Sequence, residues 1–269
     1  MLISAGCQIS FDCPQPTPML LMVSPHPSRL TDLIGPHEMS FDPPIPWRDY
    51  TDSYGNTCTR ILAPVGPLTI ATKFTTWDSG LPDRVAPMAV QRPPDQLPDD
   101  LILFLLGSRY CDTDRLSGMA WATFGHIPPG WSRVQAICDF VHNHITFDYQ
   151  QARPTRSAYD AFSEQYGVCR DFAHLAVTLC RCVNIPARYC TGFLGDIGVP
   201  KMDAPMDFSA WFEVYLDDRW YTFDARHNTP RIGRILMARG RDATDVAITT
   251  NFGQCILTGF SVITDEVPG

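Results

Sequence analysis

A cysteine stands where an amphipathic helix should begin, in the run from Tyr166 to His174. Helical signal continues to Asn184, and the positions of one buried face recur at helical spacing: Cys169, Phe172, Ala173, Ala176, Leu179, Cys180 and Val183. A helix N-terminus carries partial positive charge and unpaired N–H groups, which stabilise a thiolate and lower its pKa. The same N–H groups can hold the oxyanion of an attacked carbonyl. The sequence therefore predicts Cys169 as a reactive thiol on a rigid element.

A hairpin downstream supplies the candidate partners. Residues Ala210–Leu216 and Arg219–Asp224 read as two strands, joined by a tight turn at Asp217 and Asp218. A thiol on a helix that faces a hairpin ending in an aspartate is the layout of a Cys-His-Asp site. In such a site the histidine takes the thiol proton and the carboxylate orients the histidine.

In these residues the chain resembles the bacterial transglutaminase-like superfamily, the papain-like cysteine protease and acyltransferase group. Three stretches carry the resemblance: Gly167 to His174, Asn184 to Tyr189, and Ala210 to Tyr215 running on to Asp224. It covers the C-terminal half directly, and the N-terminal half resembles the β-rich domain that often precedes this catalytic domain in bacteria. The resemblance implies Cys169 as nucleophile, Asp224 as orienting carboxylate, and a histidine directly before Ala210 and Trp211.

Serine occupies that histidine position, at Ser209. A hydroxyl has no accessible basic form near neutral pH, so it cannot serve as general base, and losing the histidine of a triad typically costs several orders of magnitude in rate. Three explanations stay open: a deliberate inactivating substitution, a natural homologue that binds without turnover, or a base from elsewhere. The nearest candidate base is His227, whose alternative interpretation is a polar loop residue.

Other histidines fit the site less well. His174 lies five residues after Cys169 on the same helix, away from the thiol's face, and reads as a packing or surface residue. His142 and His144 lie two apart on another predicted helix and cannot share a face. We interpret both as surface or packing residues.

The candidate substrate-binding residues are Trp211, Tyr166 and Arg170. Trp211 could wall an acyl pocket, although a buried strand tryptophan is the commoner role. The Cys169 N–H would contribute to an oxyanion hole, with Tyr149, Gln150 or Tyr166 as guesses for a second donor. The loop 195–207, rich in Gly, Pro and Asp, is either a substrate-facing lid or a surface connection.

Composition narrows the classes of function. The 269 residues suffice for two domains, and the formal net charge of −8 argues against nucleic-acid or anionic-membrane binding. No apolar stretch is long enough to span a bilayer, and the first residues lack the features of a signal peptide.

Five arginines cluster late in the chain, either rimming an anionic-substrate pocket or pairing with Asp242 and Asp245 in a solvated loop. They are Arg226, Arg231, Arg234, Arg239 and Arg241.

The ten cysteines show no metal-site spacing and no C-x-x-C pair. Several occupy apolar-face positions, where cysteine behaves as a small hydrophobe. The simplest expectation is a cytoplasmic protein with free thiols, in which only Cys169 has a reactive context.

Short strand-like runs at 2–11, 18–24, 56–62 and 68–77, separated by turn residues, predict a β-sandwich-like N-terminal domain over 1–92. A proline-rich linker follows at 93–98. Residues 99–269 are expected to form a papain-like, transglutaminase-like α+β domain, with helices capped by Asp99 and by Thr155 or Ser157, a helix through Val134–Ile145, and strands at 187–193, 246–250 and 255–264.

Two functions compete. The first is cysteine-dependent amide or ester acyl transfer or hydrolysis through a thioester, impaired by Ser209, on a peptide, amide or other acyl substrate and with no metal or organic cofactor. The second is a non-catalytic transglutaminase-like binding or interaction module. The same triad serves protease, amidase and transamidase, so the sequence does not separate these activities or fix the oligomeric state.

Overall fold

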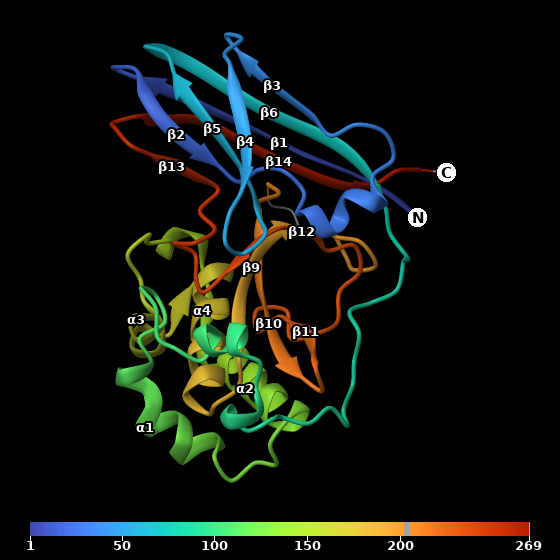
Figure 1. Ribbon diagram of the computed structural model, residues 1–269, viewed down its shortest axis with the longest axis vertical. Helices are drawn as coiled ribbons and strands as arrows, with labels where there is room; N and C mark the ends of the chain where they lie inside the picture. The colour runs from blue at the N-terminus through green and yellow to red at the C-terminus, as the bar shows by residue number, and fades with distance from the viewer. Residues whose placement is uncertain (202–204, 269) are drawn as a thin grey trace.

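The upper part of the molecule in Figure 1 is a sandwich of two antiparallel four-stranded sheets. The structure, a computed structural model, describes residues 1–201 and 205–268. One sheet has the order β14 (Ile256–Glu266), β1 (Leu2–Cys13), β6 (Gly66–Trp77) and β3 (Glu38–Asp42). The other has the order β13 (Thr249–Asn251), β2 (Thr17–Leu21), β5 (Thr57–Ala63) and β4 (Trp47–Thr51). The expected β-rich N-terminal region is confirmed.

The last two strands complete this sandwich instead of joining the second domain. β14 runs antiparallel to β1, from Ile3 opposite Glu266 to Asp12 opposite Ile256, and β13 pairs with β2. The expectation that these strands belong to an α+β domain over 99–269 is wrong in this respect. Local sequence pattern identifies a strand but does not name its partner, because pairing across the whole chain is a non-local property.

The lower part is the α+β unit that the sequence predicts. Its sheet has the order β11 (Arg219–Phe223), β10 (Ser209–Leu216), β9 (Ala187–Phe193) and β12 (Ile235–Gly240). Around it lie α1 (Thr113–Phe124), α2 (Trp131–His144), α3 (Ala158–Glu164) and α4 (Cys169–Cys182), with a short parallel pair of β7 (Thr146–Phe147) and β8 (Tyr166–Gly167). α4 is central to this layer, because Phe172, Leu175 and Leu179 join Phe212 and Val214 of β10 in one buried core.

Several elements differ from expectation. The segment after Asp99 is a 3-10 helix, η3 (Asp99–Phe104), which Asp99 does not cap through its side chain. Three further short 3-10 helices are η1 (Pro27–Asp32), η2 (Pro94–Gln96) and η4 (Tyr149–Gln151). α1, β3 and β4 were not expected. All five residues of β4 are exposed, so the strand has none of the alternation that marks a half-buried one.

The two parts share their interior. The sandwich core of residues such as Ile9 and Ile70 continues into Phe193, Phe208 and Ile235 of the second part. Figure 1 shows residues 78–98 descending along one edge of the molecule to connect the two parts. Among the described residues, no helix combines the length and apolar character needed to cross a membrane.

Cys13 and Cys255 form a disulfide, which corrects the expectation that all ten cysteines are free thiols. The bond joins the end of β1 to the residue before β14, 242 positions later in the sequence. Such a pair has no local signature, since only the pairing of β1 with β14 brings it together. The remaining eight cysteines carry free thiols.

This disulfide predicts a thiol count and a stability effect. Denatured, unreduced protein should give eight thiols with Ellman's reagent, and ten after reduction. Replacing both Cys13 and Cys255 by Ser should lower the melting temperature by roughly 5 °C or more, because a cross-link of distant residues typically contributes about 2–5 kcal/mol. Ten thiols before reduction, or an unchanged melting temperature, would show that the bond is not a stabilising part of the fold.

Candidate active site

Cys169 is the first residue of α4, as the sequence predicts. A buried carboxylate fixes the start of the helix: Asp171 accepts hydrogen bonds from the Val168 N–H at 2.9 Å and from Arg156 Nη1 at 3.1 Å. A Cβ on Gly167 would lie 2.7 Å from the Asp171 side chain, so glycine is required there by close approach. The turn that presents the thiol is therefore held by an ion pair inside the protein.

The thiol lies against β10. Cys169 Sγ is 4.0 Å from the Phe208 carbonyl oxygen, and Cys169 packs against the cluster that contains Ala210, Ala173 and Tyr189. Burial raises the pKa of Cys169 to about 11, although the nearby Arg226 acts to lower it. The expectation that the helix N-terminus lowers this pKa is wrong, because desolvation of the thiolate outweighs the favourable charges.

Asp224 follows the end of β11 and accepts four hydrogen bonds. Its Oδ1 accepts the backbone N–H groups of Arg226 and His227, both at 3.0 Å. Its Oδ2 accepts from Arg234 Nη2 and His227 Nδ1, both at 2.8 Å. Burial alone would raise the pKa of Asp224, but Arg234 and then His227 hold it below its usual range. Asp224 is therefore a buried anion that orients His227.

Ser209 and His227 line the same cavity, of about 40 Å³, which we call the Ser209 cavity. Tyr149, Asp207 and Arg226 also line it. Ser209 is 5% exposed, and its Oγ has no hydrogen-bond partner among the described residues. Cys169 Sγ is 4.0 Å from the carbonyl oxygen of Phe208, which lines this cavity, so the thiol adjoins it. Ser209 and His227 thus share one cavity, with Asp224 bonded to His227 and Cys169 beside Phe208 of the same lining.

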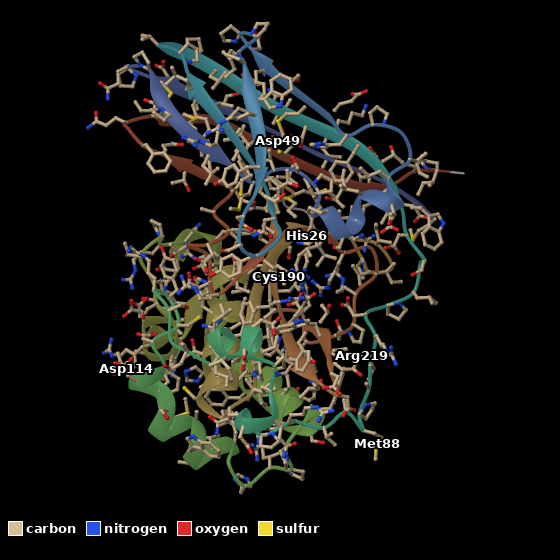
Figure 2. All side chains as sticks on the ribbon, viewed as in Figure 1. His26, Asp49, Met88, Asp114, Cys190 and Arg219 are labelled. Atoms are coloured by element: carbon tan, nitrogen blue, oxygen red, sulfur yellow. A yellow bond between two sulfur atoms is a disulfide. The ribbon has the colours of Figure 1, made fainter. Side chains whose placement is uncertain are left out.

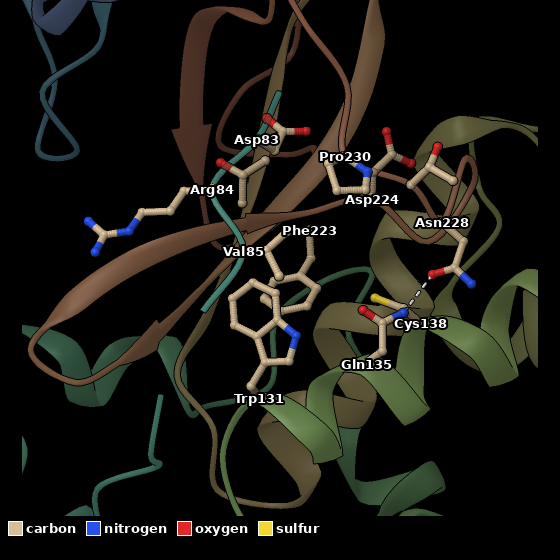
Figure 3. A pocket seen from close by; sticks show the side chains of 12 residues that line it. Asp83, Arg84, Val85, Trp131, Gln135, Cys138, Phe223, Asp224, Asn228 and Pro230 are labelled. Carbon is tan, nitrogen blue, oxygen red and sulfur yellow. Dashed lines mark hydrogen bonds between the residues drawn. The ribbon is translucent and has the colours of Figure 1, made fainter. Parts of the chain in front are cut away.

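A second cavity, of about 210 Å³, lies behind Asp224. Figure 3 shows Trp131, Phe223 and Val85 gathered around it, with Asp224 at one side and a hydrogen bond of 2.9 Å from Gln135 to Asn228. Its lining comes from α2, β11 and the connection before α1. This cavity is mainly apolar next to the carboxylate, unlike the Ser209 cavity.

The three candidate substrate-binding residues lie elsewhere. Trp211 is 2% exposed, with the Arg234 guanidinium 5.1 Å from its ring centre. Tyr166 is partly exposed with Arg156 over its ring, and Arg170 binds the Arg153 carbonyl oxygen. These three are absent from the lining of the Ser209 cavity, whereas Tyr149, a guessed oxyanion donor, is present. Gln150 is exposed and does not line this cavity.

The other histidines pack, as expected. His174 is fully buried between the rings of Tyr110 and Tyr189, each 4.9 Å away, and its Nε2 accepts the Ala243 N–H. Burial lowers its pKa to about 3, so it is neutral. His142 is at the surface, and its Nδ1 donates to the Arg226 carbonyl oxygen at 2.9 Å. His142 thereby steadies the loop that carries His227.

The loop 195–207, interpreted as either a lid or a surface connection, lies partly outside the described residues, since Met202, Asp203 and Ala204 fall there. Both described ends of the loop reach the Ser209 cavity: Asp196 on one side, and Pro205, Met206 and Asp207 on the other. Among the described residues, no group of three or more His, Cys, Asp or Glu side chains is arranged to hold a metal ion.

The chain is similar to several known proteins. Residues 122–225 match the family described as the transglutaminase-like superfamily. A solved structure from Cytophaga hutchinsonii, provisionally assigned as a cysteine protease, superposes with a TM-score of 0.85 at 29% identity, covering 100% of this chain and 91% of its own. The periplasmic domain of TgpA from Pseudomonas aeruginosa gives a TM-score of 0.40 at 16% identity, covering 83% and 90%.

An uncharacterised Mycobacterium leprae protein, ML0607, is 35% identical over 98 residues, which are 34% of this chain and 33% of the relative. The chain thus matches about a third of that relative's length. The chain carries a domain of the transglutaminase-like superfamily, preceded by a β-rich N-terminal region. Its fold is that of the Cytophaga hutchinsonii protein, which is provisionally assigned as a cysteine protease.

The buried Asp171–Arg156 pair predicts a large effect on stability. Asp171→Ala should lower the free energy of unfolding by about 3–5 kcal/mol, because it leaves the Arg156 guanidinium, 2% exposed, without this partner. Glu164→Ala is the matched control, since Glu164 pairs with the same arginine but is 26% exposed, and should cost about 1 kcal/mol or less. Equal losses in urea denaturation would contradict the assignment.

The raised pKa of Cys169 predicts an unusual alkylation profile. A thiol with a raised pKa keeps its proton longer, so the rate with iodoacetamide should keep rising above pH 8.5, toward the pKa of about 11. Arg226→Gln should slow the reaction at pH 9, because Arg226 lowers the pKa. Mass spectrometry locates the label, with Cys169→Ala as control. A plateau below pH 8.5 would instead indicate a thiolate stabilised by a neighbouring cation.

Proposed function

We propose that this protein catalyses cysteine-dependent acyl transfer or hydrolysis on a peptide, amide or other acyl substrate. The observation that carries the proposal is the placement of Cys169 at the start of α4 beside a cavity lined by the Asp224-oriented His227. Cys169 Sγ attacks the carbonyl carbon and forms a thioester as the bond to the leaving amine or alcohol breaks. Water or an amine then attacks the thioester and releases the free thiol.

His227 is the proposed base. Its Nδ1 bonds the Asp224 carboxylate at 2.8 Å, and no described residue bonds its Nε2. A carboxylate accepts only, so Nδ1 carries the hydrogen and Nε2 of the neutral ring has a free lone pair. In the first step Nε2 takes the proton of the Cys169 thiol and passes it to the leaving group. In the second step it takes a proton from the attacking water or amine and returns it to the thiol.

The serine at position 209 is compatible with this arrangement. The resemblance places a histidine there that would bond Asp224, yet here Asp224 Oδ2 is already occupied by His227 and Arg234. A small side chain at 209 leaves room in the cavity beside His227. In this proposal the base is carried by the loop after β11 instead of by β10, and position 209 no longer needs a histidine.

The oxyanion is assigned to the start of α4. Within the described residues, the Cys169 N–H makes no hydrogen bond, as expected for the first residue of a helix. A tetrahedral oxyanion next to Sγ would accept from this group. Tyr149, which lines the cavity, is the candidate second donor.

The alternative function is a binding module without turnover. Two observations favour it: Ser209 stands in place of the family's histidine, and burial keeps the Cys169 thiol protonated. The two functions differ in whether any acyl group becomes attached to Cys169.

The decisive experiment compares the acylation of the unmodified chain with that of four variants, using a panel of activated esters and amides followed by intact-mass spectrometry. The unmodified chain should form a thioester that is absent in Cys169→Ala. His227→Gln should lower the acylation rate by about 10²-fold or more, the usual contribution of a general base. Ser209→Ala should change it only a few-fold, because Ser209 has no partner to lose.

The other outcomes are equally informative. If His227→Gln reacts as fast as the unmodified chain, His227 is not the base. If the unmodified chain is inert and Ser209→His becomes active, position 209 is a vacant base position and the protein is a disarmed enzyme. If neither protein acylates with any member of the panel, the binding-module function replaces the enzymatic one.

A further inference from the structure

A polar cavity of about 300 Å³ lies between the two parts of the molecule, and we call it the arginine cavity. Its walls are η1, the residues 78–83 that begin the connection, and one face of the sheet β11-β10-β9-β12. Trp211 and Glu213 line it, whereas the alternating Phe212 and Val214 pack in the α4 core. The arginine cavity is therefore on the sheet face opposite α4.

Four arginines line this cavity: Arg29, Arg231, Arg234 and Arg239. The sequence left open whether the late arginine cluster rims a pocket or lies in a solvated loop. The structure divides it, since Arg231, Arg234 and Arg239 line this cavity, Arg226 lines only the Ser209 cavity, and Arg241 pairs with Asp245. Arg29 joins them from the other end of the sequence.

The carboxylates in the wall are already engaged. Asp83 bonds Arg234 Nε at 2.8 Å and also accepts the Arg231 backbone N–H. Glu213 accepts from Arg188 at 2.6 Å, outside this cavity's lining. Asp78 Oδ2 is 3.9 Å from Arg29 Nη2. Arg29 also pairs with Asp32 at 2.9 Å, and Arg231 and Arg234 each have a carboxylate within 4 Å. Arg239 is therefore the lining arginine without a carboxylate partner among the described residues.

Several arginine nitrogens have no partner within the described parts of the chain. Arg231 and Arg234 are only 6% and 8% exposed, and Arg231 Nε and Arg234 Nη1 make no hydrogen bond there. The Arg239 guanidinium, half-buried, forms no hydrogen bond or ion pair with a described residue. Buried polar groups are normally satisfied. The two buried nitrogens have almost no accessible surface, so the half-buried Arg239 guanidinium is the group on the cavity wall that can take up an acceptor from a ligand.

Positive charges gather around Arg239. Burial and then Arg188 lower the pKa of Arg239, which means that these two cations repel each other. Burial, Arg239 and Arg188 together lower the pKa of His26 to about 4. The His26 N–H donates to the Leu236 carbonyl oxygen of β12, and Figure 2 shows His26 at the level where the sandwich meets the lower sheet. An anion bound beside Arg239 would relieve this repulsion.

We propose that the arginine cavity binds a small ligand through a phosphate or carboxylate group. Guanidinium groups present forked donors that match both oxyanions, and arginine is preferred wherever such groups are recognised. The volume accommodates an oxyanion with a small organic body. The site is distinct from the Cys169 chemistry, although Arg231 lines both cavities and Arg234 also bonds Asp224.

Direct binding tests this site without any need for activity. Inorganic phosphate and citrate, the two probes, are titrated calorimetrically at constant ionic strength with chloride as the balancing salt. The expected result is one saturable site per chain. Arg239→Gln and, separately, Arg29→Gln should weaken it at least tenfold. Arg48→Gln, an equal loss of charge on the exposed strand β4, should leave it unchanged.

Circular dichroism confirms that each variant is folded, and Arg29→Gln serves if Arg239→Gln is not. Tighter binding of phosphate than of citrate assigns a phosphorylated ligand, and the reverse assigns a carboxylate. Heat that does not saturate, or equal weakening by Arg48→Gln, indicates non-specific ion screening and overturns the proposal. Because the readout is binding, failure of Cys169 acylation would leave this result untouched.

Discussion

The site depends on keeping one carboxylate charged inside the protein. Asp224 is 6% exposed, and an isolated buried carboxylate would take up a proton instead of remaining an anion. Arg234 prevents this by bonding Asp224 on one side and Asp83 on the other, so a chain of alternating charges links the connection at Asp83 to the end of β11. The buried anion then fixes the loop after β11 through two backbone N–H groups, which places His227.

The same constraint explains how Asp224 can have an imidazole partner although position 209 is a serine. A buried anion must have its hydrogen bonds filled, and two donors on Asp224 Oδ2 already do so. A histidine on β10 and His227 would compete for the same oxygen. The chain has a single imidazole next to Asp224, carried by a loop instead of a strand, and His142 braces that loop through the Arg226 carbonyl oxygen.

Local sequence patterns predicted the helix and strands that carry the site. They did not predict which distant strands pair or how burial changes the pKa of a side chain. The start of α4 at Cys169, β9 at 187–193 and the hairpin turn at Asp217 and Asp218 follow from helical spacing, alternation and turn residues. The pairing of β14 with β1 and the bond from Cys13 to Cys255 do not, since each joins opposite ends of the chain. The exposed strand β4 had no pattern to detect.

The Cys169 pKa shows why helix position alone does not decide reactivity. A helix N-terminus favours a thiolate by an amount that falls within the first turn and depends on exposure. Here the sulfur also pays the desolvation cost of lying against β10, and that cost is the larger effect. The thiol is then neutral before substrate arrives, so attack on a carbonyl requires proton removal in the same step. If Cys169 is the nucleophile, as we propose, a base beside it is more important here than in a site with a preformed thiolate. His227, which bonds Asp224 and lines the Ser209 cavity, is the base that we propose for it.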